Sequence, residues 1–176
     1  MPNNFSHFNP IGTIFKGTDI AKCNELKYFP LITDIPDFAG CSKLTEANFD
    51  NIKELNKDGC FQHTNITYMY FPAVVNARMF YSFINAHTRG VRFGNNLKTL
   101  YDIFELGAPE YCIIGSLLPP IMNRAAFVAK RYYIPDSVVE SYKTAPVWKN
   151  ISDKIYPFSQ FAKDFPHEPE RMYEPL

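Results

Sequence analysis

The chain has 176 residues, enough for one domain with a substantial core. Its 18 basic and 18 acidic residues cancel at pH 7, so no net field draws the chain to nucleic acid, and we expect no nucleic-acid partner. Aromatic residues form 16% of the chain and prolines number 14. Because 46% of the residues are hydrophobic and the net charge is zero, the chain does not have the composition of a disordered polar tract. The prolines therefore indicate extended segments laid over another surface.

The sequence predicts a chain in three parts. Residues 1–44 form an extended N-terminal arm, because prolines separate short aromatic clusters and no period of 3.6 or 2 residues is sustained. Residues 45–143 form a helical core, and residues 144–176, where prolines alternate with aromatic residues, form a C-terminal docking arm. We therefore expect a mainly α protein with long irregular arms, little sheet and no internal repeat.

Three short helices are expected in the core. The first is amphipathic and covers Thr45–Asp58, where apolar residues recur every third position and Gly59 can end the helix in the left-handed conformation. The second covers Leu97–Leu106. The third begins at Pro135, where the missing N–H costs nothing, and ends near Lys143.

The stretch Ile66–Ala86 is the candidate membrane segment. As a helix it would be about 31 Å long, just enough to cross a bilayer, and Tyr68, Tyr70 and Tyr81 resemble aromatic residues at a membrane interface. Its single formal charge, Arg78, offsets the favourable insertion of its apolar residues. A spanning helix would therefore need partner helices. The alternative is a buried helix or strand pair in a soluble core.

Six residues are predicted to contact a membrane or a partner. Arg78 should pair with a neighbouring subunit, since a buried arginine needs a carboxylate or carbonyl partner. Arg89 and Arg92 are candidate contacts for lipid headgroups, with ordinary surface ion pairs as the alternative. The remaining candidates are the interfacial tyrosines, Tyr68, Tyr70 and Tyr81.

No catalytic, cofactor-binding or metal-ligating residue is predicted, and the chain is not expected to be an enzyme. The four histidines are scattered, and none forms a pair at helical metal-binding spacing. The cysteines lie too far apart in sequence for a zinc knuckle. They are interpreted as buried thiols, with two disulfides as the alternative in an oxidising compartment: Cys23, Cys41, Cys60 and Cys112.

Four segments carry a family resemblance. Ile32–Phe38 holds a Pro-Asp-Phe element, and Arg78–Ser82 holds an arginine followed by two bulky residues, a tyrosine and a small residue. In this order they resemble the N-terminal and transmembrane part of the mitochondrial Rieske iron–sulfur protein. Phe127–Arg131 and Ser137–Ser141 are similar to the base of that family's head domain. The Cys-His loops that would bind its cluster are absent, so the resemblance implies a relative without a cofactor.

The resemblance and the candidate membrane segment together predict a non-catalytic accessory subunit. Its expected place is a respiratory-chain complex of the mitochondrial inner membrane, with complex III or a supercomplex as candidates. Its expected partners are other subunits of that complex, with phospholipid as a further candidate. The alternative is a soluble structural or scaffold component of a large assembly, with residues 66–86 buried in its core.

Overall fold

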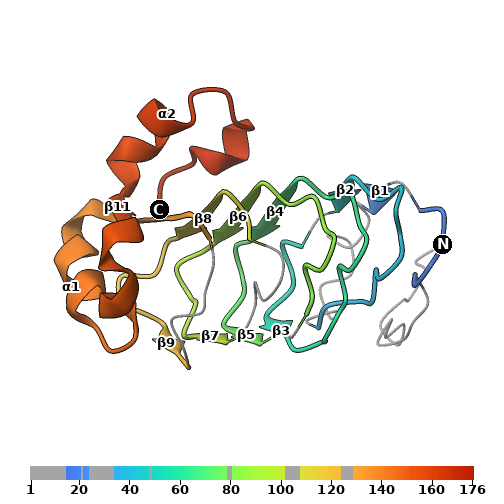
Figure 1. The fold of residues 1–176 in the computed structure, drawn as a ribbon, viewed down its shortest axis with the longest axis horizontal. Helices are drawn as coiled ribbons and strands as arrows, with labels where there is room; N and C mark the ends of the chain where they lie inside the picture. The colour runs from blue at the N-terminus through green and yellow to red at the C-terminus, as the bar shows by residue number, and fades with distance from the viewer. Residues whose placement is uncertain are drawn as a thin grey trace, which may run out of the picture.

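The computed structural model describes residues 15–20, 22–23, 34–47, 49–78, 81–101, 108–123 and 129–176. In this part of the chain, short parallel strands stack into two sheets that face each other (Figure 1). The larger sheet, in the order β11-β10-β8-β6-β4, contains β4 (Tyr68–Phe71), β6 (Gly90–Phe93), β8 (Tyr111–Ile114), β10 (Arg131–Ile134) and β11 (Ile155–Pro157). The smaller sheet, in the order β3-β5-β7-β9, contains β3 (Glu54–Leu55), β5 (Asn76–Arg78), β7 (Thr99–Tyr101) and β9 (Ile121–Met122).

The chain alternates between the two sheets, so it winds as a solenoid. From β3 to β10 each strand lies in the sheet opposite its predecessor, and each turn of the chain adds one strand to each sheet. Tyr68, Gly90, Tyr111 and Arg131 are partners across successive strands, so their residue numbers give coils of 22, 21 and 20 residues. A separate two-stranded sheet pairs β1 (Lys22–Cys23) with β2 (Glu46–Ala47). Such repeats bury a continuous core only by stacking on their neighbours.

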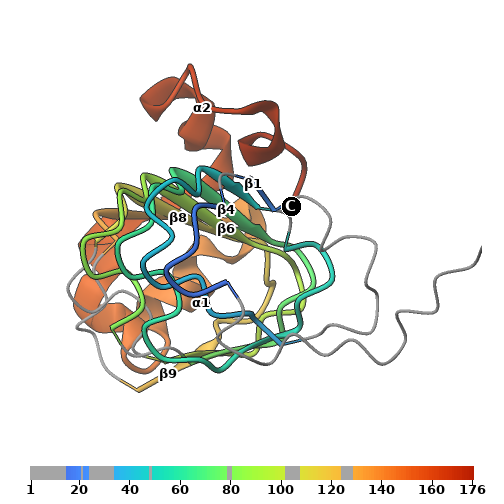
Figure 2. The ribbon, with the colours of Figure 1, turned by 90° about the vertical axis from the view of Figure 1, so that its right-hand side faces the viewer.

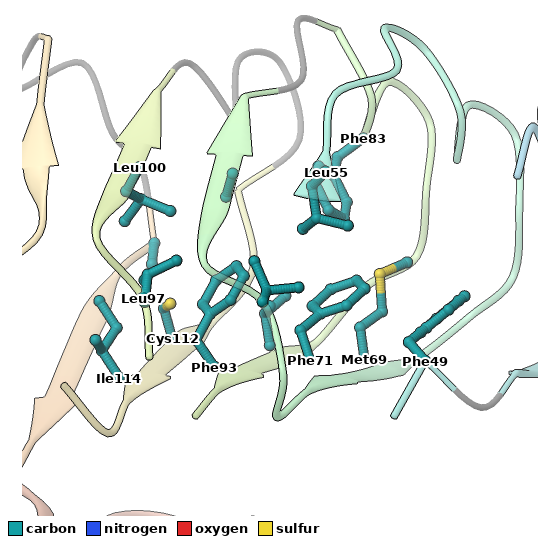
Figure 3. Close-up of a cluster of buried hydrophobic side chains, with 14 of the residues drawn as sticks. Phe49, Leu55, Met69, Phe71, Phe83, Phe93, Leu97, Leu100, Cys112 and Ile114 are labelled. Carbon is teal, nitrogen blue, oxygen red and sulfur yellow. The ribbon is translucent and has the colours of Figure 1, made fainter. Parts of the chain in front are cut away.

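The core lies between the two sheets. Phe49, Phe71 and Phe93 from successive coils form a stacked column, with ring centroids 5.0 and 5.5 Å apart (Figure 3). Leu55 and Leu100 face this column from the smaller sheet, and all five side chains are fully buried. Because burial of a large apolar side chain contributes roughly 1.5–3 kcal/mol, this repeated column is a main source of the stability of the solenoid.

The predicted mainly α fold is wrong. The stretch Ile66–Ala86 contains β4 and β5 with turns around them, and its residues 79–80 lie outside the described part. Along β4, Met69 and Phe71 lie in the core and the residues next to them are partly exposed. This alternation of every second residue is typical of a strand. No helix among the described residues is long and apolar enough to cross a bilayer. The alternative, a buried segment with strands, describes this stretch better, although its two strands join different sheets.

The three predicted helices have different outcomes. The described part of Thr45–Asp58 forms turns and short strands, and the apolar residues Ile52 and Leu55 lie in the solenoid core. Leu97–Leu106 contains β7, and its residues 102–106 lie outside the described part. The third prediction is confirmed. The 3₁₀ helix η2 (Asp136–Val138) follows Pro135 and leads into α1 (Val139–Thr144).

The C-terminal part of the core caps the last coils. Trp148 lies in the 3₁₀ helix η3 (Trp148–Lys154) and is buried against the rings of Tyr132 and Tyr142, in edge-on contacts of 5.5 and 5.0 Å. Its indole N–H donates to the Pro120 carbonyl at 2.8 Å, and the Tyr142 hydroxyl donates to the Ser116 carbonyl at 2.8 Å. Caps of this kind close the exposed end of a solenoid core.

After β11 the chain turns back over the larger sheet (Figures 1 and 2). We call residues 158–176 the C-terminal arm. The arm contains η4 (Phe158–Gln160), α2 (Phe161–Asp164) and η5 (Glu170–Met172), and no strand follows β11 in this fully described segment. The arm is drawn in red above the strands of the larger sheet in both views. The division of the whole chain into three parts stays a prediction.

Candidate functional site: a tyrosine and arginine face under the C-terminal arm

Side chains that point away from the core line the outer face of the larger sheet. Because side chains alternate along a strand, each strand that buries one set of residues in the core presents the other set outside. The outward set packs with the arm in a second apolar cluster, separate from the core between the sheets. We define the outer face by the outward residues Tyr68, Tyr70, Arg92, Tyr111, Arg131, Tyr133 and Tyr156, together with Arg89, which directly precedes β6.

The outer face holds the arm residue Glu168 by both carboxylate oxygens. Arg89 contacts Oε1 through Nη2 at 2.8 Å and through Nε at 3.0 Å, and the Tyr111 hydroxyl donates to Oε2 at 2.9 Å. The Glu168 side chain is only 2% exposed. Gly90 makes room for this arrangement, because a Cβ there would lie 2.4 Å from the Tyr111 ring. Arg89 and Tyr111 therefore form a binding site for a carboxylate, and Glu168 supplies the acceptors that their donors need.

A second arm carboxylate, Asp164, lies in an equivalent setting. The Tyr133 hydroxyl donates to its Oδ2 at 2.6 Å, and Arg131 Nη1 lies 2.9 Å from the same oxygen. Its side chain is mostly buried, at 19% exposure. Asp164 and Glu168 are thus each bound by one tyrosine and one arginine of the face. Charge-assisted hydrogen bonds of this kind are about twice as strong as neutral ones.

Two aromatic side chains of the arm fill the space between these polar sites. Phe161 is fully buried, with its ring 4.9 Å from that of Tyr111 and 5.1 Å from that of Tyr133. Phe165 lies 4.6 Å from the Tyr111 ring and has the Arg131 guanidinium 5.8 Å from its centre. Edge-on aromatic pairs and arginine–ring contacts add about 0.5–1.5 kcal/mol each to simple burial.

Arg92 fastens the end of the arm. Its guanidinium donates to the carbonyls of Met172 at 2.9 Å, Glu174 at 2.7 Å and Pro175 at 3.1 Å. Burial lowers the pKa of Arg92, while the charge of Glu174 opposes that shift. An arginine remains charged after such a shift, so three main-chain carbonyls of the arm accept hydrogen bonds from a charged donor.

The arm also reaches the earlier coils. The Arg171 guanidinium lies 4.5 Å from the centre of the Tyr70 ring, and its Nη2 is 2.6 Å from Asp50 Oδ1. The arm therefore contacts four strands of the larger sheet, β10, β8, β6 and β4. Beside Arg92 and Arg171 a small cavity of about 260 Å³ remains, lined also by Asn95 and Asn96.

The environment of the face predicts a loss of stability at alkaline pH. Burial, and to a smaller extent the nearby Glu168, raises the pKa of Tyr68 to about 12. Burial also raises the pKa of Tyr70 to about 12, although the charge of Arg171 opposes this shift. An unfolded tyrosine releases its proton near pH 10. Between about pH 10 and 12 the unfolded chain therefore binds fewer protons than the folded chain, so the free energy of unfolding falls as the pH rises.

Urea unfolding at a series of alkaline pH values measures this loss of stability. The tyrosinate absorbance of the folded protein, measured over the same pH range, reports the titration of its tyrosines. The variant Tyr70→Phe lacks one of these hydroxyls and should lose less stability between about pH 10 and 12 than the wild-type chain. Tyrosinate absorbance that rises fully near pH 10 in the folded protein, with unchanged stability, would contradict the expectation.

The structure brings four of the six predicted contact residues together on the outer face. Tyr68, Tyr70, Arg89 and Arg92 contact or adjoin the arm. Arg78 lies elsewhere, in β5 of the smaller sheet, and Tyr81 lies in a turn with its side chain 47% exposed. Their proposed roles at a membrane or a partner stay predictions.

Sequence reasoning missed three of the four residues that bind the two carboxylates: Tyr111, Arg131 and Tyr133. Tyr111 and Tyr133 are 22 residues apart, and both stand at outward positions of strands. The arm also carries a regular pattern of aromatic and acidic residues at Phe161, Asp164, Phe165 and Glu168. Alternation within the short strands, together with this spacing, is the signal that could have found the site.

The cysteines within the described residues behave as predicted for buried thiols. Cys41, Cys60 and Cys112 are fully buried. Burial raises the pKa of the Cys60 and Cys112 thiols, so both stay protonated and act as small core side chains. The part of the chain that the structure describes contains no group of three or more residues suited to hold a metal ion.

A second surface feature lies at the opposite sheet. Leu117, Leu118 and Ile121 are 61%, 77% and 64% exposed; the two leucines lie in the loop before β9, and Ile121 is its first residue. They border a groove of about 680 Å³ that also includes Leu97 and Lys98. Contiguous exposed apolar side chains of this kind mark interaction surfaces more often than isolated ones do.

Comparisons with known proteins add no family to these observations. The chain matches no protein-family model. A search of curated proteins likewise finds no significant match.

Proposed function

We propose that this protein is a non-catalytic structural scaffold component of a multiprotein assembly, and that its outer face holds polypeptide segments. The observation that carries the proposal is the docking of the arm. The face binds it through two carboxylates, Asp164 and Glu168, and through a run of main-chain carbonyls on Arg92. Function is argued from this site, since a solenoid by itself specifies none.

The composition of the face supports the same role. Tyrosine and arginine are enriched where proteins bind other proteins, because they combine a large apolar surface with directional hydrogen bonds. The exposed side chains of Leu117, Leu118 and Ile121 add an apolar surface on the opposite side. The proposal therefore continues the scaffold alternative from the sequence, with residues 66–86 contributing strands to the core.

The respiratory-chain prediction has lost its main motivation. It rested on a helix over residues 66–86, and that stretch contains strands and turns in its described part. The mitochondrial location and the Rieske resemblance stay predictions, and no contact in the structure favours them over the scaffold.

Native gel electrophoresis of extracts from the protein's own cells tests the proposal. The chain should migrate well above its 20.3 kDa mass. The double variant Arg89→Ala/Arg131→Ala should migrate at lower mass, because it removes both arginines that bind carboxylates on the face.

A matched control, Lys53→Ala/Lys149→Ala, removes two exposed charges away from the face and should migrate like the wild type. Circular dichroism of each purified variant shows whether it is folded. A wild-type chain that migrates as a monomer in gentle extracts would overturn the scaffold role.

A further inference from the structure

We propose that the outer face binds a short segment of a partner protein in exchange for the C-terminal arm, and that this segment carries two aromatic and two acidic side chains in the order aromatic-x-x-acid-aromatic-x-x-acid. This inference rests on the proposed scaffold function and names the chemistry of its partner. The arm shows what the face accepts, because it is the polypeptide that occupies the face in the structure.

The pattern of the segment follows from the arm side chains that contact the face. Phe161, Asp164, Phe165 and Glu168 are spaced i, i+3, i+4 and i+7, and all four side chains contact the outer face. The chain is helical over α2 and leaves the helix at Phe165, and Pro166, which cannot continue a helix, begins a turn that carries Glu168. A partner segment therefore needs one helical turn followed by a tight turn with an acidic residue.

The face provides a separate binding group for each of these four side chains. Arg89 and Tyr111 bind the second acid, and Arg131 and Tyr133 bind the first. The two tyrosine rings also form the surface on which both phenylalanines pack. A segment without the acids would leave the Tyr111 hydroxyl, within a buried site, without its acceptor, which selects against it.

The arm can leave without opening the core. The core cluster between the two sheets includes residues up to Ile155 and takes none from the arm. The arm forms no strand, so its departure breaks no ladder between strands. Its contacts are confined to the second cluster and to polar groups at the surface of the solenoid. Segments of this kind open independently of the global unfolding of a protein.

The arm also sets how strongly a partner must bind. A tethered arm competes at an effective concentration that is in the millimolar range for a short linker. The wild-type chain should therefore bind a free segment much more weakly than a chain whose arm is weakened. A partner segment can thus bind the face only when the arm has left it.

Fluorescence anisotropy with a labelled peptide of the sequence Gln160–Pro169 tests this exchange. The full chain with Asp164→Lys and Glu168→Lys places lysines opposite Arg131 and Arg89, so its arm should detach while the face stays intact. This variant should bind the peptide at least about tenfold more tightly than the wild-type chain. A control peptide with the same two lysine substitutions should not bind. Equal binding of both peptides, or no binding of either, overturns the proposal.

Hydrogen exchange of the wild-type chain provides a test that does not depend on the variant. Excess wild-type peptide should reduce the protection of amides in residues 161–172 and leave that of β6 and β8 unchanged. Unchanged protection of the arm at saturating peptide overturns the proposal.

Size-exclusion chromatography separates a partner from a second copy of the chain. A wild-type dimer formed by exchange of arms would assign the face to a second copy and overturn the partner class. If the chain enters large native particles and the peptide does not bind, the scaffold function stands and this inference fails. If the peptide binds and the native chain is a monomer, the scaffold function fails instead.

Discussion

Phe71→Ala should lower the free energy of unfolding by about 3–5 kcal/mol, the usual cost of removing a fully buried phenylalanine ring. Phe71 lies in the middle of the phenylalanine column and touches the rings of Phe49, Phe61 and Phe93. Its loss leaves a cavity between coils that the short strands on either side cannot close without shifting their register. Since a domain is stable by only about 5–15 kcal/mol, the variant should lose a large share of its stability.

Urea denaturation followed by circular dichroism measures this effect. Tyr81→Ala is a suitable control, because it removes an aromatic side chain that is 47% exposed, and the expected change is within about 0.5 kcal/mol. A Phe71→Ala variant that unfolds at the same urea concentration as this control would show that the column contributes little to stability.

Trp148→Ala should destabilise the chain by a similar amount, about 3–5 kcal/mol, and should also cause association. The substitution removes the ring that covers Tyr132 and Tyr142, and it leaves the Pro120 carbonyl without its indole donor. The end of the apolar core then becomes accessible to other molecules. Solenoids need polar caps because an open end presents such a surface.

Light scattering and urea denaturation test the cap together. Trp148→Phe keeps an aromatic ring and loses only the indole N–H, so it should remain monomeric with a smaller loss, about 1–3 kcal/mol, for the unsatisfied carbonyl and the reduced ring. Monodisperse Trp148→Ala protein of nearly wild-type stability would mean that α1 and η3 do not protect the core.

The sequence allowed some local features to be predicted. Pro135 and Asp136 indicated a helix start, and the structure has η2 and α1 there. Gly59 was expected to adopt a left-handed conformation and has a φ of 68°, although it stands in a turn and ends no helix. Both features depend on the backbone preferences of one or two residues, which act at short range.

The solenoid itself could not be read from the same patterns. Its strands have two to four residues, too few to establish a period, and inward positions of equivalent coils accept different side chains. Phe71, Phe93 and Ile114 occupy one row, and Leu55, Ala77 and Leu100 occupy another. The coils also differ in length. Equivalent positions of successive coils share burial but not residue type. Residues 66–86 alone therefore resemble a single apolar segment.

The candidate site was only partly predictable for a related reason. The sequence singles out Tyr68 and Tyr70 within the apolar stretch, and Arg89 and Arg92 just after it, because that stretch is interpreted as a membrane helix. The carboxylates that complete the site are far along the chain, with Glu168 57 residues from Tyr111 and 79 from Arg89. No local rule connects positions so distant. Their proximity follows from the number of coils and from the return of the arm.

Because the arm returns over several strands of the larger sheet, it fits a solenoid of only one number of coils. From Asp164 over β10 to Arg171 over β4 the arm crosses three strand spacings, about 14 Å at roughly 4.8 Å each. It does so with seven residues, which include the turn after α2. Insertion or deletion of one coil would move every later anchor by one strand spacing and leave the arginines beside the wrong arm residues. Coil number and arm sequence must therefore change together.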